Sequence, residues 1–246
     1  MRLALLPLAL LATTPLSAQP ISPQLRAALA DKTRPQADID RDVARHPLEL
    51  LSLAGIKSGQ KVGDFMMGGG YFTRILSNAV GPKGRVYAYQ AGEFIGFRPA
   101  YGDEQKAAVA GRANVTPLSM KIGEVAFPEK LDAIITVQNY HDLYLKFGGP
   151  AFAEAVTKRL YNSLKAGGTF LVVDHVANAD PDFVVPDKLH RIDPVAARKA
   201  IEKAGFVFVS ESKLLAAPGD PHDKNVFDPS IRGKTDQFIY LFRKPK

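Results

Sequence analysis

The chain has 246 residues and a formal net charge of +7, with 46% hydrophobic and 23% charged residues. This composition excludes a disordered chain and a protein with many membrane spans, and the length suits one α/β domain with a sizeable core. The positive charge favours anionic ligands, but no run of Lys and Arg alternates with aromatic residues, so no nucleic-acid site is predicted. The lack of cysteine excludes disulfides, thiolate metal sites and a cysteine nucleophile.

The first residues have the pattern of a secretory signal. Arg2 is followed by an apolar run from Leu3 to Ala12 and then by small and polar residues up to Ala18. The run is too short to cross a bilayer as a helix, which takes about 20 residues. We therefore expect residues 1–18 to be a signal peptide that is removed on export, leaving a periplasmic protein without a membrane span.

Residues 19–45 are polar and rich in proline, so we interpret them as an N-terminal arm. Within this arm, only the apolar residues near Leu25 suggest a short helix. The domain proper is expected to cover residues 46–246. It starts with a helix over residues 46–55, which has proline in its first turn and glycine at its end.

The most informative stretch runs from Lys61 to Tyr71. It is typical of a short buried strand, a turn through the consecutive glycines Gly68, Gly69 and Gly70, and a following amphipathic helix. Glycines permit unusual backbone angles and close approach of a ligand, and a helix N-terminus attracts anionic groups. Open α/β sheets hold nucleotide-like ligands in this way, although glycine clusters also make plain turns.

Strands and helices alternate along the rest of the chain. We expect strands near residues 85–90, 115–118, 131–137, 169–173, 206–209 and 238–242, and helices near residues 103–112, 152–164 and 195–204. Ala166–Gly168 is interpreted as the turn that ends the long helix, and residues 214–233 as a loop between the last two strands. This order predicts a mainly parallel sheet with one antiparallel strand.

These features resemble the class I S-adenosylmethionine-dependent methyltransferases, in particular exported proteins described as predicted methyltransferases. The resemblance covers about residues 46–243 and rests on residues 62–73, 80–88 and 164–169. It implies an α/β, Rossmann-like fold with a seven-stranded sheet and helices on both faces. It also implies S-adenosylmethionine as the cofactor and a small-molecule acceptor of unknown identity, while the oligomeric state stays open.

The resemblance also assigns cofactor-binding residues. Asp64, Gly68 and Gly70 would hold the methionine part, with backbone amides facing its carboxylate and Asp64 accepting from the ammonium or ordering the turn. Met66 stands where the family usually has its first glycine, so the turn must tolerate a side chain there. The full set is Asp64, Met66, Gly68, Gly69, Gly70, Gln90 and Glu93.

Gln90 and Glu93 enter this set through the second strand. The family places there an acid that accepts both ribose hydroxyls, whereas this chain has the neutral Gln90 at the strand end and Glu93 three residues later. The acid that commonly contacts adenine after the third strand has no clear counterpart. Cofactor binding is therefore expected with altered contacts.

Polar residues follow the fourth strand at the edge where such sheets bind ligands. Asn139, Tyr140 and His141 are the predicted catalytic residues. Methyl transfer needs a general base only when the acceptor must lose a proton, and His141, with an ordinary pKa near ~6.5, suits that task while Tyr140 would wall the pocket. The alternative is that Tyr140 and His141 pack or cap the next helix.

Asp174 and His175 end the neighbouring strand and are expected at the same edge. Together with His141 and Asp142 they form a set that can ligate a divalent ion, a placement similar to that in metal-dependent methyltransferases of catechols. Helix capping and ordinary hydrogen bonds explain these residues equally well, so no metal site is predicted.

Two further histidines have candidate roles. His190 and Arg191 precede a helix with Asp193 as its cap, and both are candidates for the acceptor site. His222 belongs to the late loop, where a solvated position is favoured over a role in a lid.

Two alternatives to a methyltransferase are considered. The first is a non-catalytic exported binding protein with a degenerate methyltransferase fold, which is motivated by Met66, Gln90 and the cytoplasmic origin of S-adenosylmethionine. A dinucleotide oxidoreductase fits less well because the turn lacks the G-x-G-x-x-G spacing and the second strand lacks an acid for the ribose.

Overall fold

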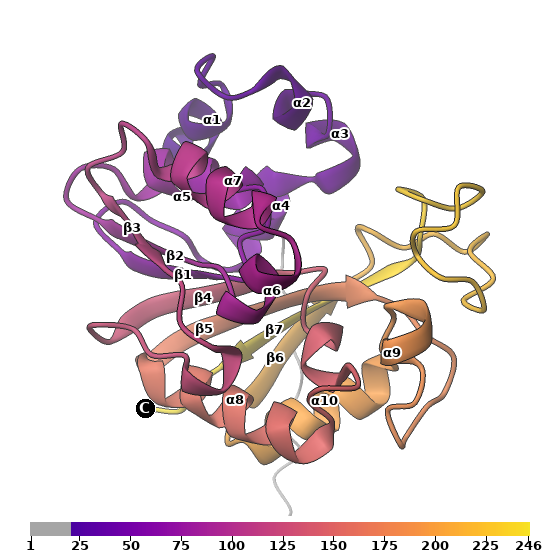
Figure 1. Ribbon diagram of the computed structural model, residues 1–246. Helices are drawn as coiled ribbons and strands as arrows, with labels where there is room; N and C mark the ends of the chain where they lie inside the picture. Colours follow the sequence, from indigo (N-terminus) through magenta and orange to yellow (C-terminus); the bar gives the residue numbers. More distant parts are fainter. Residues whose placement is uncertain (1–20) are drawn as a thin grey trace, which may run out of the picture.

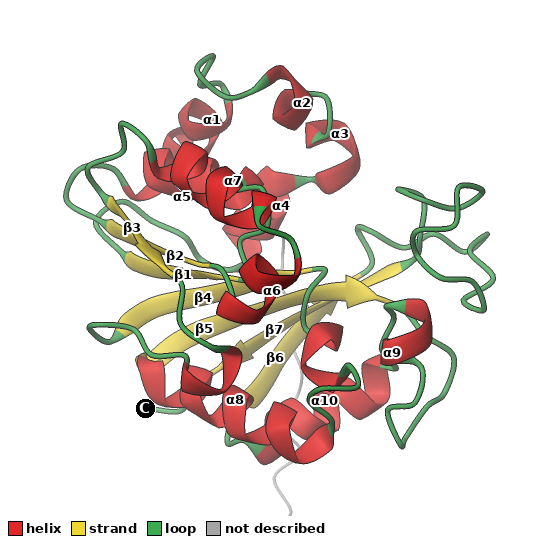
Figure 2. Cartoon of the chain, in the orientation of Figure 1, coloured by secondary structure: helices red, strands yellow, loops and turns green. Residues whose placement is uncertain are grey.

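The computed structural model describes residues 21–246 and contains one seven-stranded sheet in the order β3-β2-β1-β4-β5-β7-β6 (Figures 1 and 2). The strands are β1 (Lys61–Phe65), β2 (Arg85–Tyr89), β3 (Val115–Leu118), β4 (Leu131–Val137), β5 (Leu164–His175), β6 (Val207–Ser212) and β7 (Gln237–Arg243). The pairs of β7 with β5 and β6 are antiparallel, and the four other pairs are parallel. The predicted sheet is thus confirmed.

Helices cover both faces of the sheet, as expected (Figure 1). One face carries α1 (Pro23–Leu29), α4 (Pro47–Leu53), α5 (Tyr71–Val80) and α7 (Ala100–Val109), and the other carries α8 (Pro150–Ser163) and α10 (Pro194–Lys203). The shorter helices are α2 (Gln36–Ile39), α3 (Asp42–Arg45), α6 (Gly92–Phe97) and α9 (Pro186–Leu189), with 3-10 helices at Ile122–Glu124 and His141–Tyr144.

Successive residues of a strand place their side chains in two separate cores. In β4, Ile134 packs into the core under α8, whereas Ile135 packs into the core under α5, and neither is exposed. Strand side chains alternate between faces, so a strand covered on both sides must be almost continuously apolar. This explains why β4 could be recognised from its composition.

The junction between α8 and β5 corrects one expectation. Residues 166–168 were expected to form a turn, but α8 ends at Ser163 and β5 begins directly at Leu164. Leu164 is buried and pairs with Leu131, and a register shift follows before Thr169 pairs with Ala133. The glycines therefore lie in an irregular stretch of the strand, where Gly167 takes a φ of 79° that glycine accepts without strain.

The segment interpreted as an arm packs on the domain. It forms α1, α2 and α3 rather than one short helix, and Leu25 and Ala28 of α1 are buried in the same core as α5. Its polar residues bond to α5 through Arg74 and Tyr71. The polar composition thus reflects ion pairing, not an extended segment.

The predicted signal at residues 1–18 lies outside the described part of the chain. Within residues 21–246, no helix has both the length and the apolar character that crossing a bilayer requires.

Candidate functional site

The glycine turn leads from β1 into α5 at the carboxyl edge of the parallel strands. Met66, Gly68 and Gly70 have φ angles of 60°, 54° and 81°, so all three are left-handed. A Cβ at Gly70 would clash with Ala108 of α7, whereas a Cβ at Gly68 would meet nothing within 4 Å. Gly70 is thus required for helix packing, while Gly68 leaves open space beside the backbone.

Met66 keeps the glycine-type backbone angle despite its side chain. The side chain is 3% exposed and packs in the core under α8, away from α5. The turn therefore tolerates a side chain at this position because the chain directs it into the interior.

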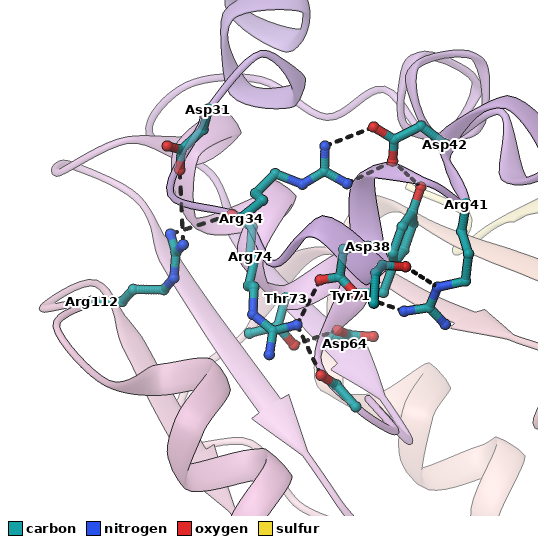
Figure 3. Close-up of polar contacts among 12 residues, drawn as sticks. Asp31, Arg34, Asp38, Arg41, Asp42, Asp64, Tyr71, Thr73, Arg74 and Arg112 are labelled. Carbon is teal, nitrogen blue, oxygen red and sulfur yellow. Dashed lines mark hydrogen bonds and ion pairs between the residues drawn. The ribbon is translucent and has the colours of Figure 1, made fainter.

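Asp64 connects β1 to α5 beneath the turn. Its Oδ2 accepts a hydrogen bond from Thr73 Oγ1 at 2.6 Å (Figure 3), and the residue is 4% exposed. Burial raises the pKa of Asp64 to about 6, because the bonds to Thr73 only partly offset the loss of water. Of its two expected roles, the bond to Thr73 fits the ordering of the turn.

Gln90 and Glu93 are both bonded to backbone amides. Gln90 Oε1 accepts from Gly68 N at 2.9 Å, so Gln90 ties the end of β2 to the turn. Both carboxylate oxygens of Glu93 accept from Ile122 N, at 3.1 and 3.0 Å. A contact of either residue with a ribose stays a prediction.

Arg45 is a cation beside the turn that the sequence analysis missed. Its Nη2 donates to Gln138 Oε1 at 2.9 Å, and its guanidinium carbon lies 4.8 Å from the ring centre of Tyr71. Arg34 and Arg41 also lie over this ring and have carboxylate partners, Asp42 and Asp38 (Figure 3). Arg45 forms no such ion pair within residues 21–246.

No sequence motif marks Arg45 as a binding residue. It reaches the turn because α3 lies over Tyr71, held by the hydrogen bond from Tyr71 to Asp42 and by the nearby ion pair of Arg74 with Asp38. The structure thus adds one cationic group to the predicted site.

His141 lies at the start of the 3-10 helix after β4 and is held by Asp174 of β5. Its Nδ1 is 2.8 Å from Asp174 Oδ1, and its backbone N–H donates to Asp174 Oδ2 at 2.7 Å. Burial alone would lower the pKa of His141, but the charges of Asp174 and Asp142 outweigh burial and raise the pKa to about 9. The ring is therefore protonated at neutral pH and accepts a proton only after it has lost this one.

Asp142 and His190 complete a group of three side chains around His141. Asp142 Oδ1 lies 3.3 Å from His141 Nε2 and 4.0 Å from His190 Nδ1. One ligand atom from each residue lies within 4.8 Å of the other two. Asn139 Nδ2 donates to the second oxygen of Asp142 at 3.2 Å, so Asn139 orients the carboxylate.

Tyr140 is completely buried. Its hydroxyl is 2.9 Å from Thr157 Oγ1, and its ring packs against Tyr144 and Phe170. Burial raises the pKa of Tyr140 to about 12. These contacts correspond to the packing alternative rather than to a pocket wall.

The remaining candidates lie in other contacts. His175 Nδ1 is 2.8 Å from Thr235 Oγ1, and burial lowers the pKa of His175 to about 4. Arg191 is buried and pairs with Asp220 at 2.7 Å. His222 is 3.0 Å from Asp236 and stays partly exposed in the late loop.

Solved structures of other proteins superimpose on this chain, whereas sequence comparisons find no match. Neither a protein-family model nor a curated protein sequence matches the chain. A S-adenosylmethionine-dependent methyltransferase from Aquifex aeolicus superimposes with a TM-score of 0.60 and 20% identity, over 85% of this chain and 95% of that one. An arsenic(III) S-adenosylmethionine methyltransferase from Chlamydomonas reinhardtii gives 0.55 and 18%, over 91% and 74%.

A third structure, described as a possible exported protein from Bordetella parapertussis, gives a TM-score of 0.52 and 15% identity, over 84% of this chain and 68% of that one. Likeness at these identities establishes the fold. The chain has the Rossmann-like fold of class I methyltransferases, and the predicted fold class is confirmed.

Proposed function

We propose that the protein is a S-adenosylmethionine-dependent methyltransferase that acts on a small molecule. The observation that carries the proposal is the turn after β1. There the buried carboxyl of Asp64 near the end of β1 is followed by Gly68, which has open space beside its backbone, and His141 follows the neighbouring parallel strand β4. Parallel α/β sheets bind ligands at this edge.

The residues around the turn fit the methionine part of the cofactor. The Asp64 carboxyl accepts from an ammonium, and the open space at Gly68 lets a ligand reach the main chain. Arg45 supplies a guanidinium for a carboxylate, because it has no ion-pair partner among residues 21–246. Gln90 Nε2, which has no bonding partner among the described residues, is a free donor toward a ribose hydroxyl.

S-adenosylmethionine supplies an activated methyl group on a sulfonium when it is bound. The protein then has to place an acceptor in line and exclude water. Asp174 holds the His141 ring through Nδ1 and directs Nε2 away from β5. His141 Nε2 is the group that takes a proton from the acceptor, once the protonated ring has released its Nε2 proton to solvent.

A calorimetric titration with S-adenosylmethionine and S-adenosylhomocysteine tests the proposal. We expect binding by the wild-type protein and at least ~10-fold weaker binding by Asp64→Asn, which removes a charge-assisted hydrogen bond worth about 1.5–3 kcal/mol. No heat at millimolar ligand would reject the proposal. A different molecule copurifying with the wild-type protein would favour the binding-protein alternative.

Asp132→Asn is the matched control for this titration. Asp132 lies at the opposite end of the sheet, where Oδ2 accepts from Lys61 N at 2.8 Å and Oδ1 pairs with Lys165. The substitution is chemically the same but is remote from the turn. We expect unchanged affinity for both ligands.

We also propose that the protein is exported and is periplasmic after removal of residues 1–18. The apolar run at the N-terminus supports this, as does the fold shared with a protein described as a possible exported protein. Mass spectrometry of the protein from a periplasmic extract should give an N-terminus near residue 19. An intact N-terminus in the cytoplasmic fraction would contradict export.

A further inference from the structure

We propose that His141, Asp142 and His190 bind a divalent transition-metal ion. The site is distinct from the glycine turn, and the inference does not depend on the proposed methyltransferase function. It differs from the sequence-based expectation of no metal site, because His190, from a separate helix, joins the two residues after β4.

The spacing of the three side chains fits one ion. Zinc bonds of about 2.0–2.2 Å in a tetrahedral site place ligand atoms about 3.4 Å apart. Asp142 Oδ1 lies 3.3 Å from His141 Nε2, which already has this spacing, and 4.0 Å from His190 Nδ1. The ligand atoms of all three residues lie within 4.8 Å of one another, so the half-buried His190 ring must move closer to its two partners to complete the set.

Outer contacts orient two of the three ligands. Metal-binding histidines almost always direct their second ring nitrogen to a carboxylate or carbonyl, which fixes the tautomer. His141 does so: Nδ1 faces Asp174 at 2.8 Å and Nε2 faces Asp142. Asn139 holds the other oxygen of Asp142, so Oδ1 is directed toward both histidines.

His190 is presented by a constrained backbone. It ends α9 in a left-handed conformation with a φ of 52°, which is uncommon for a residue with a side chain. The preceding residue is fixed to the late loop, because Val226 N donates to Leu189 O at 3.1 Å. Phe227 of the same loop packs against the His190 ring at 5.0 Å between ring centres.

The donor set indicates the class of ion. Two imidazole nitrogens and one carboxylate oxygen suit zinc, iron, cobalt or nickel, whereas magnesium and calcium prefer oxygen ligands alone. Three protein ligands leave at least one position for water or for an acceptor oxygen. With an ion bound, His141 would be a ligand rather than a base, so binding would release the proton of Nε2 to solvent, and the ion would lower the pKa of an acceptor hydroxyl.

Of the four residues considered as metal ligands from the sequence, only His141 and Asp142 belong to this site. Asp174 uses both oxygens on His141, and His175 Nδ1 is bonded to Thr235. Asp174 and His175 therefore make other contacts, and His190 takes the third ligand position.

Metal titration of tag-free protein, stripped with a chelator and without S-adenosylmethionine, tests the inference. We expect calorimetry with Zn²⁺ to show one site, and Co²⁺ to give visible absorption bands of a low-symmetry site. His190→Asn should weaken Zn²⁺ binding by more than about 100-fold, beyond the effect of losing an outer-shell partner. Asparagine tolerates the left-handed conformation, so the backbone is preserved.

His46→Asn is the matched control. His46 also has a left-handed backbone, with a φ of 45°, but its ring lies outside the three-residue group. We expect its Zn²⁺ affinity to equal that of the wild type. Asp142→Asn is a second test, because it retains the side-chain shape and removes the anionic ligand.

Two results would overturn the inference. One is the absence of Zn²⁺ and Co²⁺ binding by the wild-type protein. The other is wild-type affinity in His190→Asn or Asp142→Asn proteins whose circular dichroism and melting temperature show a folded state. Because no S-adenosylmethionine is present, either result leaves the methyltransferase proposal untouched.

Discussion

Asp174 holds His141 through both of its carboxylate oxygens, one on the ring Nδ1 at 2.8 Å and the other on the backbone N–H at 2.7 Å. A single strand residue thereby fixes both the start of the 3-10 helix His141–Tyr144 and the orientation of the His141 ring. Asp174 is fully buried and His141 is 3% exposed. The pair therefore combines a structural role with positioning of the candidate site.

We expect Asp174→Asn to lower the free energy of unfolding by about 3 kcal/mol, because it breaks a buried ion pair. The same change should weaken Zn²⁺ binding about 10–100-fold through loss of the outer-shell carboxylate. Urea denaturation and calorimetry measure the two effects. Asp132→Asn, which changes a carboxylate bonded to Lys61 N at the opposite end of the sheet, is the control and should leave Zn²⁺ affinity unchanged.

Arg191 and Asp220 form a second buried pair with a purely structural role. Two guanidinium nitrogens contact the two carboxylate oxygens at 2.7 and 2.9 Å, and neither side chain is accessible to solvent. Asp220→Asn should cost about 3–5 kcal/mol, because it leaves Arg191 buried without its counter-charge. Asp228→Asn, in an exposed turn of the same loop, should change stability by less than about 0.5 kcal/mol.

The Arg191–Asp220 pair also predicts acid sensitivity. Burial opposes the ionised form, but the bonds from Arg191 outweigh it and keep the pKa of Asp220 below its ordinary value of 3.8. The stabilisation is thus fully present above pH 3.8 and is lost as the pH falls through the pKa of the folded state. Wild-type protein should lose more stability than Asp220→Asn below pH 4, and parallel losses would contradict this assignment.

The strands could be predicted because each carries its own signal. The composition of β4 is almost continuously apolar, and the turn after β1 contains three successive glycines. The end of α8 could not be placed correctly, because Ala166–Gly168 has the composition of a turn. Residues 166–168 belong to β5 because Leu164 pairs with Leu131, which is a tertiary contact.

The candidate site was predictable in its strand-end residues and not in its other members. Asp64 lies near the end of β1 and His141 follows β4, so their edge of the sheet can be derived from the topology. His190 meets Asp142 from a helix 48 positions later in the chain, and Arg45 bonds to Gln138 across 93 positions. No local pattern encodes such contacts, which depend on how loops and short helices fold back over the sheet.

The buried carboxyl of Asp64 predicts pH-dependent cofactor binding. Its pKa of about 6 means that it is neutral under mildly acidic conditions, when it cannot pair with an ammonium. S-adenosylmethionine affinity should therefore rise with pH through about 6, and Asp64→Asn should abolish this dependence. Calorimetry from pH 5 to 8 measures it, and an unchanged pH profile in Asp64→Asn would exclude Asp64 as the responsible group.

The same group affects stability with the opposite sign. An acid with a pKa raised from 3.8 to about 6 binds protons more tightly in the folded state, so its contribution favours folding at low pH and is lost as the pH rises through 6. Asp64→Asn should then raise the free energy of unfolding at pH 7, by at most about 3 kcal/mol. A decrease at pH 7 would show that the ionised carboxylate stabilises the fold.

The left-handed backbone at Met66 predicts an unusual order of stability among its substitutions. Both Met66→Gly and Met66→Ala remove a buried side chain, at a cost of about 2–5 kcal/mol. Alanine also retains the left-handed strain at φ 60°, which costs about 1–2 kcal/mol for a residue with a Cβ. Met66→Gly should therefore be the more stable variant in urea denaturation. At Ile75, inside α5, alanine should instead be more stable than glycine.

Substitution of Arg45 tests whether the cofactor carboxylate binds beside the turn. It donates to Gln138, lies over Tyr71 and has no ion-pair partner in the described chain, whereas the neighbouring Arg41 lies over the same ring and pairs with Asp38. If Arg45 binds the cofactor carboxylate, Arg45→Gln should weaken S-adenosylmethionine binding about 10-fold, since charge-assisted hydrogen bonds contribute about 1.5–3 kcal/mol. Arg41→Gln should change the affinity little. Calorimetry on both variants measures the difference, and equal loss in the two would assign the effect to the charge of the N-terminal segment rather than to a contact of Arg45.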